Sequence, residues 1–253
     1  MSVRSARSAI VSVLPILLFI FSCNDDNERS QECLLKKVTS KDFLIYDITR
    51  NDEGLIFKVD YEYLPSQAKV SSVFEYDAAG RVEKILEQNS FRTYEYSGTG
   101  KVIFEESFHR TDASSPFSSF KNRTFSYNEQ DILDSVIHSD GQYASYERNA
   151  EGNINRVYRG WKGSSESLLT EYSFDNKKNP FGDLPIMYTV YVLGEASVIT
   201  TSLNPPAFNI NNVVSSKAFS NTGEFQVSSI TYTYNDAGYP ATINGETYEY
   251  DCK

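Results

Sequence analysis

One short phrase recurs along this chain: an aromatic residue, a polar residue, Tyr, Asp or Asn, a turn, and then a branched apolar residue. The cleanest copy runs from Phe74 to Ile85. Ungapped copies start at Phe125, Tyr146 and Tyr232, and partial copies start at Tyr94, Tyr172 and Tyr248. Because each copy must adopt a similar local structure, the phrase constrains the fold more than any other feature does. A repeat of this kind predicts an architecture and leaves the activity open.

The turn inside the phrase predicts a β-hairpin. Asp or Asn followed three residues later by Gly is typical of a type I turn that closes into a glycine bulge, since the first side chain caps the turn amides and Gly adopts a left-handed backbone. In the second copy Asp occupies the glycine position, and Asp is one of the few other residues that tolerate this conformation. The predicted turn pairs are Asp77 with Gly80, Asn128 with Asp131, Asn149 with Gly152, and Asn235 with Gly238.

The residues that flank each turn alternate in polarity. Phe74 and Tyr76 lie two apart and therefore share a face of a strand, whereas Glu75 points the other way. Copy starts are 20, 31, 21, 26, 60 and 16 residues apart, which is too irregular for a strict solenoid. We therefore predict an all-β fold: an antiparallel meander of β-hairpin (YD-like) repeats, about 14 strands in a strongly curved sheet or a soluble barrel. Its outward positions carry Glu, Ser, Thr and Arg, whereas a lipid-facing band requires apolar residues.

The N-terminal segment predicts a lipoprotein signal peptide. Arg4 and Arg7 precede an apolar run from Ala9 to Phe21, and the run ends in Ile-Phe-Ser-Cys, which resembles the lipobox of bacterial lipoproteins. Residues 1–22 are then removed, Cys23 receives the lipid, residues 23–33 form an acidic tether, and residues 34–253 form a single β-meander domain. An ordinary secretory signal that happens to contain Cys is the alternative. Because more than one acyl chain anchors a protein firmly, we predict a membrane partner through the lipid.

The charge balance bears on partners. Removal of residues 1–22 takes away two Arg and no acidic residue, leaving 22 basic against 34 acidic side chains. Such a surface repels phosphate backbones, so we expect no nucleic-acid partner.

Two cysteines remain after lipidation. Cys33 lies where the tether meets the first strand, and Cys252 lies one residue from the C-terminal end of the sequence. If the meander curves until its first and last strands are neighbours, these two form a disulfide; otherwise they are separate thiols.

A wider resemblance supports this architecture. The Tyr-Asp-x-x-Gly-Arg-Val segment resembles the YD repeats of Rhs-type and teneurin-type shells. The order of three segments, from Tyr172 to Phe181, from Asn211 to Val214 and from Tyr232 to Pro240, resembles a family of surface lipoproteins of unknown function with a porin-like β fold. This likeness covers roughly residues 55–251. It implies an outer-membrane protein, lipid-anchored and facing the cell exterior, and it supplies no catalytic residues.

The sequence contains no clear catalytic or metal-binding motif. His109 and His138 have no partner at metal-ligand spacing, and we expect both at the surface. No nucleophile elbow or phosphate-binding loop occurs, so we predict no catalytic residues, no metal and no cofactor. Trp161 lies in a Gly/Ser-rich loop, where its ring either forms an exposed platform for sugar or peptide or folds back over the end of the sheet.

Two function classes remain. The first is a non-catalytic surface lipoprotein that acts as a binding or structural module for a glycan, a peptide or an envelope protein. The second is an enzyme that degrades extracellular polymers with carboxylates in its long loops. Two carboxyl groups about 5–9 Å apart in a cleft would favour the enzyme.

Overall fold

The computed structural model describes residues 32–40, 44–63, 67–181, 209–220 and 222–253, all within the compact unit Gln31–Lys253. The predicted signal peptide, Cys23 and most of the tether lie outside these residues. The described residues form strands and turns, and none of them forms a helix that could cross a membrane.

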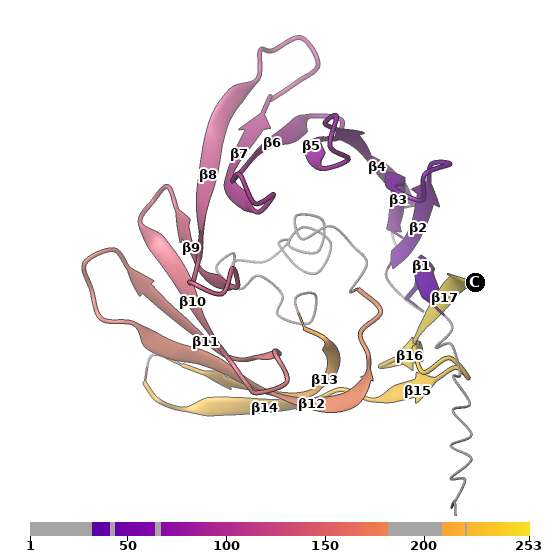
Figure 1. Cartoon of the computed structure of the whole chain (residues 1–253). Helices are drawn as coiled ribbons and strands as arrows, with labels where there is room; N and C mark the ends of the chain where they lie inside the picture. Colours follow the sequence, from indigo (N-terminus) through magenta and orange to yellow (C-terminus); the bar gives the residue numbers. More distant parts are fainter. Residues whose placement is uncertain (1–31, 41–43, 64–66, 182–208, 221) are drawn as a thin grey trace, which may run out of the picture. The chain divides into compact units, whose positions relative to one another are not determined.

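In the described part of the chain, seventeen strands make up one antiparallel sheet, which confirms the predicted all-β meander (Figure 1). The strands are β1 (Cys33–Thr39), β2 (Leu44–Arg50), β3 (Ile56–Tyr63), β4 (Ala68–Tyr76), β5 (Val82–Leu86), β6 (Ser90–Tyr96), β7 (Val102–His109), β8 (Ser118–Tyr127), β9 (Leu133–His138), β10 (Gln142–Arg148), β11 (Ile154–Trp161), β12 (Ser167–Lys178), β13 (Asn211–Phe219), β14 (Phe225–Ser229), β15 (Tyr232–Tyr234), β16 (Pro240–Ile243) and β17 (Glu246–Cys252).

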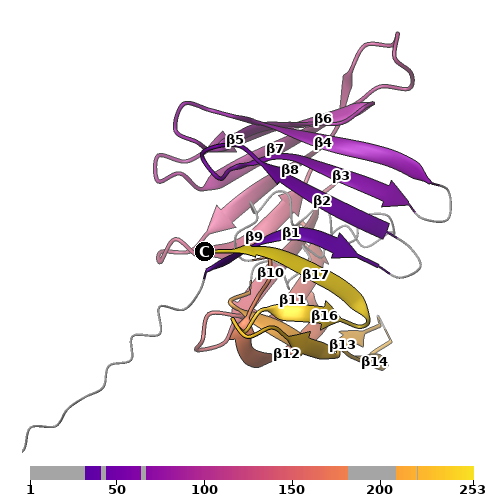
Figure 2. The ribbon, with the colours of Figure 1, turned by 90° about the vertical axis from the view of Figure 1, so that its right-hand side faces the viewer.

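The sheet curves strongly but does not close into a barrel. Each described strand pairs with the next one along the chain except β14 and β15, and β17 pairs with β1 (Figures 1 and 2). Only two residues separate β14 from β15, so this stretch first pairs with β13 and then changes partner to β16. Side chains span the resulting seam: the Tyr232 hydroxyl donates to the Val213 carbonyl over 2.7 Å. The predicted number of strands was too low because hairpins form outside the recognised copies.

The predicted turns form as expected. Gly80, Gly152 and Gly238 have φ of 75°, 89° and 78°, and Asp131 has φ of 62°. In each turn the fourth residue donates its N–H to the carbonyl of the first, and the first residue's N–H donates to the carbonyl of the fifth. The capping side chains accept backbone N–H groups; Asp77 Oδ1, for example, accepts from Ala79 and Arg81. Turns with the same backbone bonds also form at Asn51–Gly54, Ser97–Gly100 and Ser220–Gly223.

The alternation of the strands places the first aromatic of most copies of the phrase in the core. These rings are less than a tenth exposed at Phe74, Tyr94, Phe125, Tyr146 and Tyr248. The intervening residues Glu75, Glu95, Glu147 and Glu249 are exposed. Burial of this aromatic face supplies much of the hydrophobic stabilisation of the sheet.

The second aromatic of the phrase joins neighbouring hairpins. Its hydroxyl donates to the carbonyl of the apolar residue that follows the turn of an adjoining hairpin. These bonds are Tyr76 to Ile56 and Tyr96 to Val82, both 2.6 Å, Tyr127 to Val102, 2.9 Å, and Tyr250 to Pro240, 2.8 Å. Burial raises the pKa of Tyr76 and of Tyr127 to about 12, so both hydroxyls remain protonated donors at neutral pH. We call this repeated bond the tyrosine latch.

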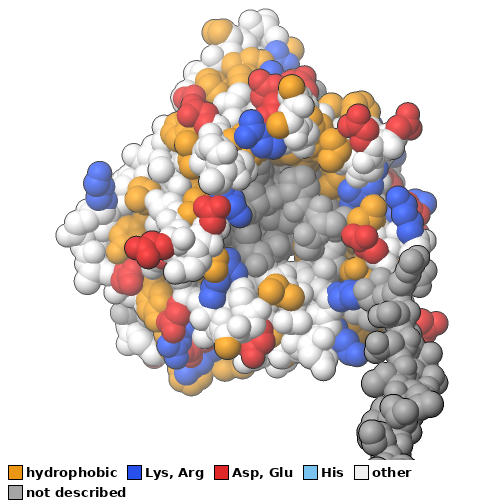
Figure 3. All heavy atoms as spheres, in the orientation of Figure 1, with side chains coloured by type: hydrophobic (Ala, Val, Ile, Leu, Met, Phe, Trp, Pro, Cys, Tyr) orange, Lys and Arg blue, Asp and Glu red, His pale blue; other side chains and the backbone are white. Residues whose placement is uncertain are grey.

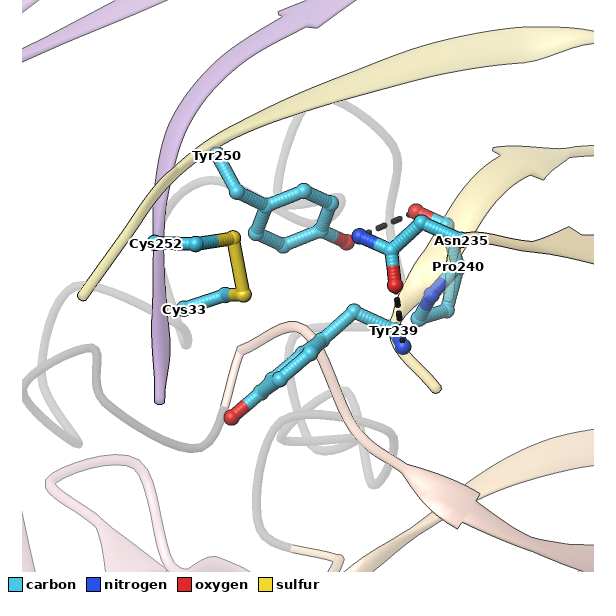
Figure 4. The surroundings of a disulfide bond; sticks show 6 residues. All are labelled: Cys33, Asn235, Tyr239, Pro240, Tyr250 and Cys252. Atoms are coloured by element: carbon cyan, nitrogen blue, oxygen red, sulfur yellow. Dashed lines mark hydrogen bonds between the residues drawn. A yellow bond between two sulfur atoms is a disulfide. The ribbon is translucent and has the colours of Figure 1, made fainter. Parts of the chain in front are cut away.

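A disulfide joins the first strand to the last (Figure 4). Cys33 and Cys252 lie opposite each other in the β1–β17 ladder, with their Cα atoms 4.0 Å apart and 219 residues apart in sequence. The bridged alternative for these cysteines is therefore confirmed. Beside it, the Tyr250 latch to Pro240 ties β17 to β16 (Figure 4).

Candidate functional site

The sheet splits between β11 and β12. Their ladder covers Arg156–Arg159 of β11 and Ser167–Glu171 of β12, whereas β11 begins at Ile154 and β12 continues to Lys178. In the phrase that starts at Tyr172, Phe174 occupies the position of the latch tyrosine. Since phenylalanine has no hydroxyl, it cannot make the bond to the neighbouring hairpin that Tyr76, Tyr96 and Tyr127 make. The ladders of the latched pairs β3–β4, β5–β6 and β7–β8 also stop two residues after the first strand begins, so the separation does not depend on the latch.

A cleft of about 830 Å³ occupies this split. Polar residues dominate its lining, which consists of Asn149, Glu151, Asn153, Asn155, Tyr172, Ser173, Phe174, Asp175, Asn176 and Asn211. Five of these ten residues are asparagines. The cleft is therefore a surface of carboxamides with two aromatic rings and two carboxylates.

Hydrogen bonds between carboxamides hold the end of the cleft in place. Asn153, which is 1% exposed, donates from Nδ2 to Asn211 Oδ1 over 2.8 Å. Its Oδ1 accepts the backbone N–H groups of Ile210 and Asn211 over 2.8 and 3.0 Å. Asn209 Oδ1 accepts the N–H of Ile154. These bonds fix the segment that precedes β13 against the start of β11 and make the end of the cleft rigid.

The carboxylate of Asp175 is engaged in structural bonds. It accepts the backbone N–H of Asn212 over 3.1 Å, the side-chain amide of Asn212 and the hydroxyl of Tyr234. Burial, together with this hydrogen bond, raises the pKa of Tyr234 above its ordinary value. Asp175 thus connects the wall of the cleft to β13 and to β15 across the seam.

Asn155 is different, because its carboxamide oxygen is buried and accepts no hydrogen bond. Asn155 is the extra residue in a bulge of the β10–β11 ladder, where Glu147 pairs with Arg156 and Arg148 pairs with Ile154. A buried acceptor without a donor is unfavourable by about 1–3 kcal/mol. This oxygen is the unsatisfied group of the cleft.

The turn that borders the cleft provides a test of the packing there. A Cβ atom at Gly152 would lie 3.2 Å from Ile210 Cδ1, whereas a Cβ at Gly80 would meet nothing within 4 Å. Gly152→Val is expected to lower the free energy of unfolding by about 2–3 kcal/mol, because a β-branched residue is strained at positive φ. Gly80→Val measures the backbone strain alone, and urea denaturation compares the two. Equal stability of Gly152→Val and wild type would contradict the turn geometry.

The structure brings only some of the predicted site residues together. Asn149 lines the cleft and Gly152 lies in the same turn, whereas the other capped turns lie elsewhere along the sheet. Trp161 ends β11 and is 54% exposed, which agrees with the exposed alternative. Sequence reasoning missed Asn153, Asn155, Asn176 and Asn211. The recurrence of Asn at 149, 153 and 155 was the available signal, and it was hidden because Asn is also common in turns.

A second polar group lies on the inner face, where Glu105, Arg123 and His138 follow one another across β7, β8 and β9. Arg123 Nη1 lies 3.5 Å from Glu105 Oε1, and both side chains are almost fully buried. Burial and the positive charges of Arg123 and Lys121 lower the pKa of His138 to about 4. The predicted surface position is wrong for His138, which is 5% exposed, because it continues the inward-facing row; His109 is exposed. Among the described residues, no group of His, Cys, Asp and Glu could hold a metal ion.

The outer face carries cross-strand rows of opposite charge. Arg156 Nε lies 2.9 Å from Glu171 Oε1, and Arg156 Nη1 lies 3.4 Å from Glu147 Oε2. On the side of the molecule drawn in Figure 3, acidic, basic and apolar side chains are interspersed. Strands β10, β11 and β12 therefore have the polar, solvent-facing outer surface that the sequence predicts.

No family model matches the chain, and no curated protein matches it. Among the solved structures that share its fold are two porin-like proteins. A porin-like protein from Bacteroides uniformis is 14% identical, with a TM-score of 0.53 over 87% of this chain and 95% of that chain. A porin-like protein from Bacteroides vulgatus is 15% identical, with a TM-score of 0.51 over 87% of this chain and 98% of that chain. At these identities the likeness shows the fold alone.

Proposed function

We propose that this chain is a non-catalytic surface lipoprotein of a bacterial outer membrane, and that it binds a ligand in the cleft between β11 and β12. The observation that carries the proposal is the cleft itself: a preformed space bordered by carboxamides whose orientation is fixed by their own hydrogen bonds. Preorganised polar groups lower the entropy lost on binding. The two solved structures that share the fold are described as porin-like, which is consistent with a protein of the cell envelope.

The topology fits a lipid anchor at Cys23. Residue Cys33 starts β1 at the same edge of the sheet where β2, β4, β6, β8 and β10 end in their turns. Cys33 lies ten positions after Cys23, so a fully extended chain between them would span at most about 35 Å. The charged rows of the outer face suit contact with water rather than with acyl chains. Signal peptide 1–22, tether 23–33 and domain 34–253 remain parts of the proposal.

Lipidation has a direct test. Cys23→Ala is expected to abolish incorporation of a clickable fatty acid and to release the protein from membranes, since the acylated sulfur is lost. Fluorescence of the labelled protein and fractionation of cells measure the two effects. Undiminished labelling of the variant would show that the signal has been misassigned.

A non-catalytic role is favoured by the carboxylates of the cleft. Glu151 and Asp175 both line it, and an enzyme would need two such carboxyl groups about 5–9 Å apart. However, the carboxylate of Asp175 accepts hydrogen bonds from Asn212 and Tyr234, and these bonds indicate a structural role for it. Incubation with extracellular polysaccharides is therefore expected to release no reducing ends. Release that disappears in Glu151→Gln would favour the enzyme.

The binding role is tested by capture from envelope extract with wild type and Asn155→Ala. The captured material is separated into glycan, peptide and protein fractions. We expect one fraction to be enriched by wild type and lost with the variant. Asp134→Ala is the matched control, because Asp134 is the extra residue of the equivalent bulge in the β8–β9 ladder. Identical capture by all three proteins would contradict a binding role for the cleft.

A further inference from the structure

We infer that the open edge of β14 pairs with the same edge of a second copy of this chain, so that two sheets join about a two-fold axis at Gln226. The inference concerns the seam of the sheet and does not depend on the function proposed for the cleft. It follows from the unpaired backbone groups of β14, from its sequence, and from the register that a neighbouring turn permits.

Strand β14 has a partner on one side only. Its ladder joins Phe225–Ser229 to residues 215–219 of β13 without a register shift. No other strand of the described part of the chain pairs with it, because the chain changes partner to β16 once β15 begins. All five residues of β14 are exposed. The strand is therefore an open sheet edge, which is a surface that can take up a further strand.

A hydrogen bond at the end of this ladder shows which backbone groups of β14 point outward. The Ile230 N–H donates to the Val214 carbonyl over 2.9 Å. In an antiparallel ladder every second residue exchanges bonds with the partner strand, and the residues between direct their N–H and C=O groups the other way. The even-numbered residues therefore bond to β13, whereas Phe225, Val227 and Ser229 direct their N–H and C=O groups to the open side.

The strand lacks the features that commonly protect an edge from pairing. Edge strands of natural proteins often carry Lys, Pro or a bulge. Strand β14 reads Phe-Gln-Val-Ser-Ser, and its ladder contains no bulge. Phe225 and Val227 share one face and are 57% and 58% exposed. The Lys217 ammonium lies 4.1 Å from the centroid of the Phe225 ring, so the nearest charge belongs to β13. The open edge itself is uncharged and bordered by apolar side chains.

The turn after β16 limits the register of an added strand. The Asn244 N–H donates to the Thr231 carbonyl over 2.9 Å and closes the edge at that point. In an antiparallel pairing that stops short of this turn, Phe225 lies opposite Val227 of the other copy, and Gln226 lies opposite its own counterpart. A shift of two residues toward β15 would bring the turn before the other copy's β14 onto Asn244. A shift the other way would pair fewer of the outward groups.

This register makes the edge complementary to itself. Phe225 of each copy exchanges N–H and C=O bonds with Val227 of the other, and their side chains form apolar cross-strand pairs on one face. The two Gln226 carboxamides meet on the opposite face, where each offers donors and an acceptor. No like charges face each other across the axis, although the chain has a net charge of −10 and two copies repel each other elsewhere. A charged peptide would find no opposite charge on this strand.

Disulfide cross-linking of the full-length protein, purified in detergent, tests the register. Gln226→Cys places two sulfurs on directly opposed residues, whose Cα atoms lie about 4.5 Å apart in such a pair. Ser228→Cys is the matched control, because it is exposed on the same face but lies more than about 13 Å from its counterpart. The native Cys33–Cys252 pair is bridged and does not compete. We expect Gln226→Cys to form a covalent dimer on mild oxidation at least tenfold faster than Ser228→Cys.

A second pair of variants tests the backbone bonds. In the Gln226→Cys background, Val227→Pro removes an outward N–H but no bond to β13, and proline is tolerated at such edge positions. Val227→Thr keeps the N–H. We expect the proline variant to lose the cross-link and the threonine variant to retain it, and thermal unfolding of both measures whether the fold is kept. Sedimentation velocity without oxidant should show a concentration-dependent dimer that Val227→Pro lacks.

Three outcomes would overturn the inference. Equal cross-linking rates for Gln226→Cys and Ser228→Cys would indicate chance collisions, and a cross-link that Val227→Pro leaves unchanged would exclude a role for the backbone bonds. If Gln226→Cys in intact envelopes links only to other proteins, the edge recruits a foreign strand and self-pairing is wrong. None of these outcomes bears on the cleft, whose binding role the capture experiment tests separately.

Discussion

Cys33→Ser/Cys252→Ser is expected to lower the free energy of unfolding by about 4–5 kcal/mol. The two residues are 219 apart, and a cross-link that closes so long a loop removes much entropy from the unfolded chain. The ladder between β1 and β17 is held at its end by this bond, where Cys33 pairs with Cys252. Loss of the bond should therefore also loosen the short strands β15 and β16, which depend on β17 for their place in the sheet.

Urea denaturation of the oxidised protein, the reduced protein and the double variant measures the effect. The reduced wild type and the variant should have the same stability, and amide exchange should increase first in β15–β17. Wild type that is equally stable with and without reductant would show that the ladder alone holds the two ends together.

Arg123→Met is expected to destabilise the fold by about 3–5 kcal/mol. Its partner Glu105 is 1% exposed, so the substitution leaves a carboxylate in the interior without the neighbouring positive charge. Desolvation of a buried charge is unfavourable by several kcal/mol unless a partner offsets it. Glu105→Gln instead removes the negative charge of the pair and leaves the buried guanidinium of Arg123 without its carboxylate neighbour.

A double-mutant cycle separates the pair from the rest of the inner face. Glu105→Gln/Arg123→Met should be far more stable than the sum of the single effects predicts, because it contains no uncompensated charge. Lys37→Met at the exposed Lys37–Asp47 pair is the matched surface control and should change stability by less than about 1 kcal/mol. Additive single effects at Glu105 and Arg123 would mean that the two side chains act independently.

Much of the fold was predictable because its signals are local. The Asp or Asn that caps each turn, the residue at positive φ and the alternation of Phe74, Glu75 and Tyr76 act within a few residues of one another. These features give hairpins, and hairpins joined in sequence give a meander. The same reasoning missed the turn at Ser97, because Ser replaces the usual Asp or Asn there.

The candidate site was not predictable, because it depends on residues distant in sequence. Asn153 and Asn211 are 58 residues apart and meet only when β13 is placed beside β12. The substitution of Phe174 for a latch tyrosine is visible in the sequence. That it leaves one latch bond unmade becomes apparent only when the hydroxyls of Tyr76, Tyr96 and Tyr127 are seen to join neighbouring hairpins.

The sequence by itself determined the turns, the inward aromatic face and the class of fold, since the backbone preferences of Gly and Asp and the two-residue period of a strand are properties of short segments. Only the tertiary structure decided whether the sheet closes, how Cys33 and Cys252 pair, and where the cleft forms. Each of these depends on how the small twist and curvature of every strand accumulate along seventeen strands. Each also depends on the seam, where the stretch that holds β14 and β15 changes partner from β13 to β16.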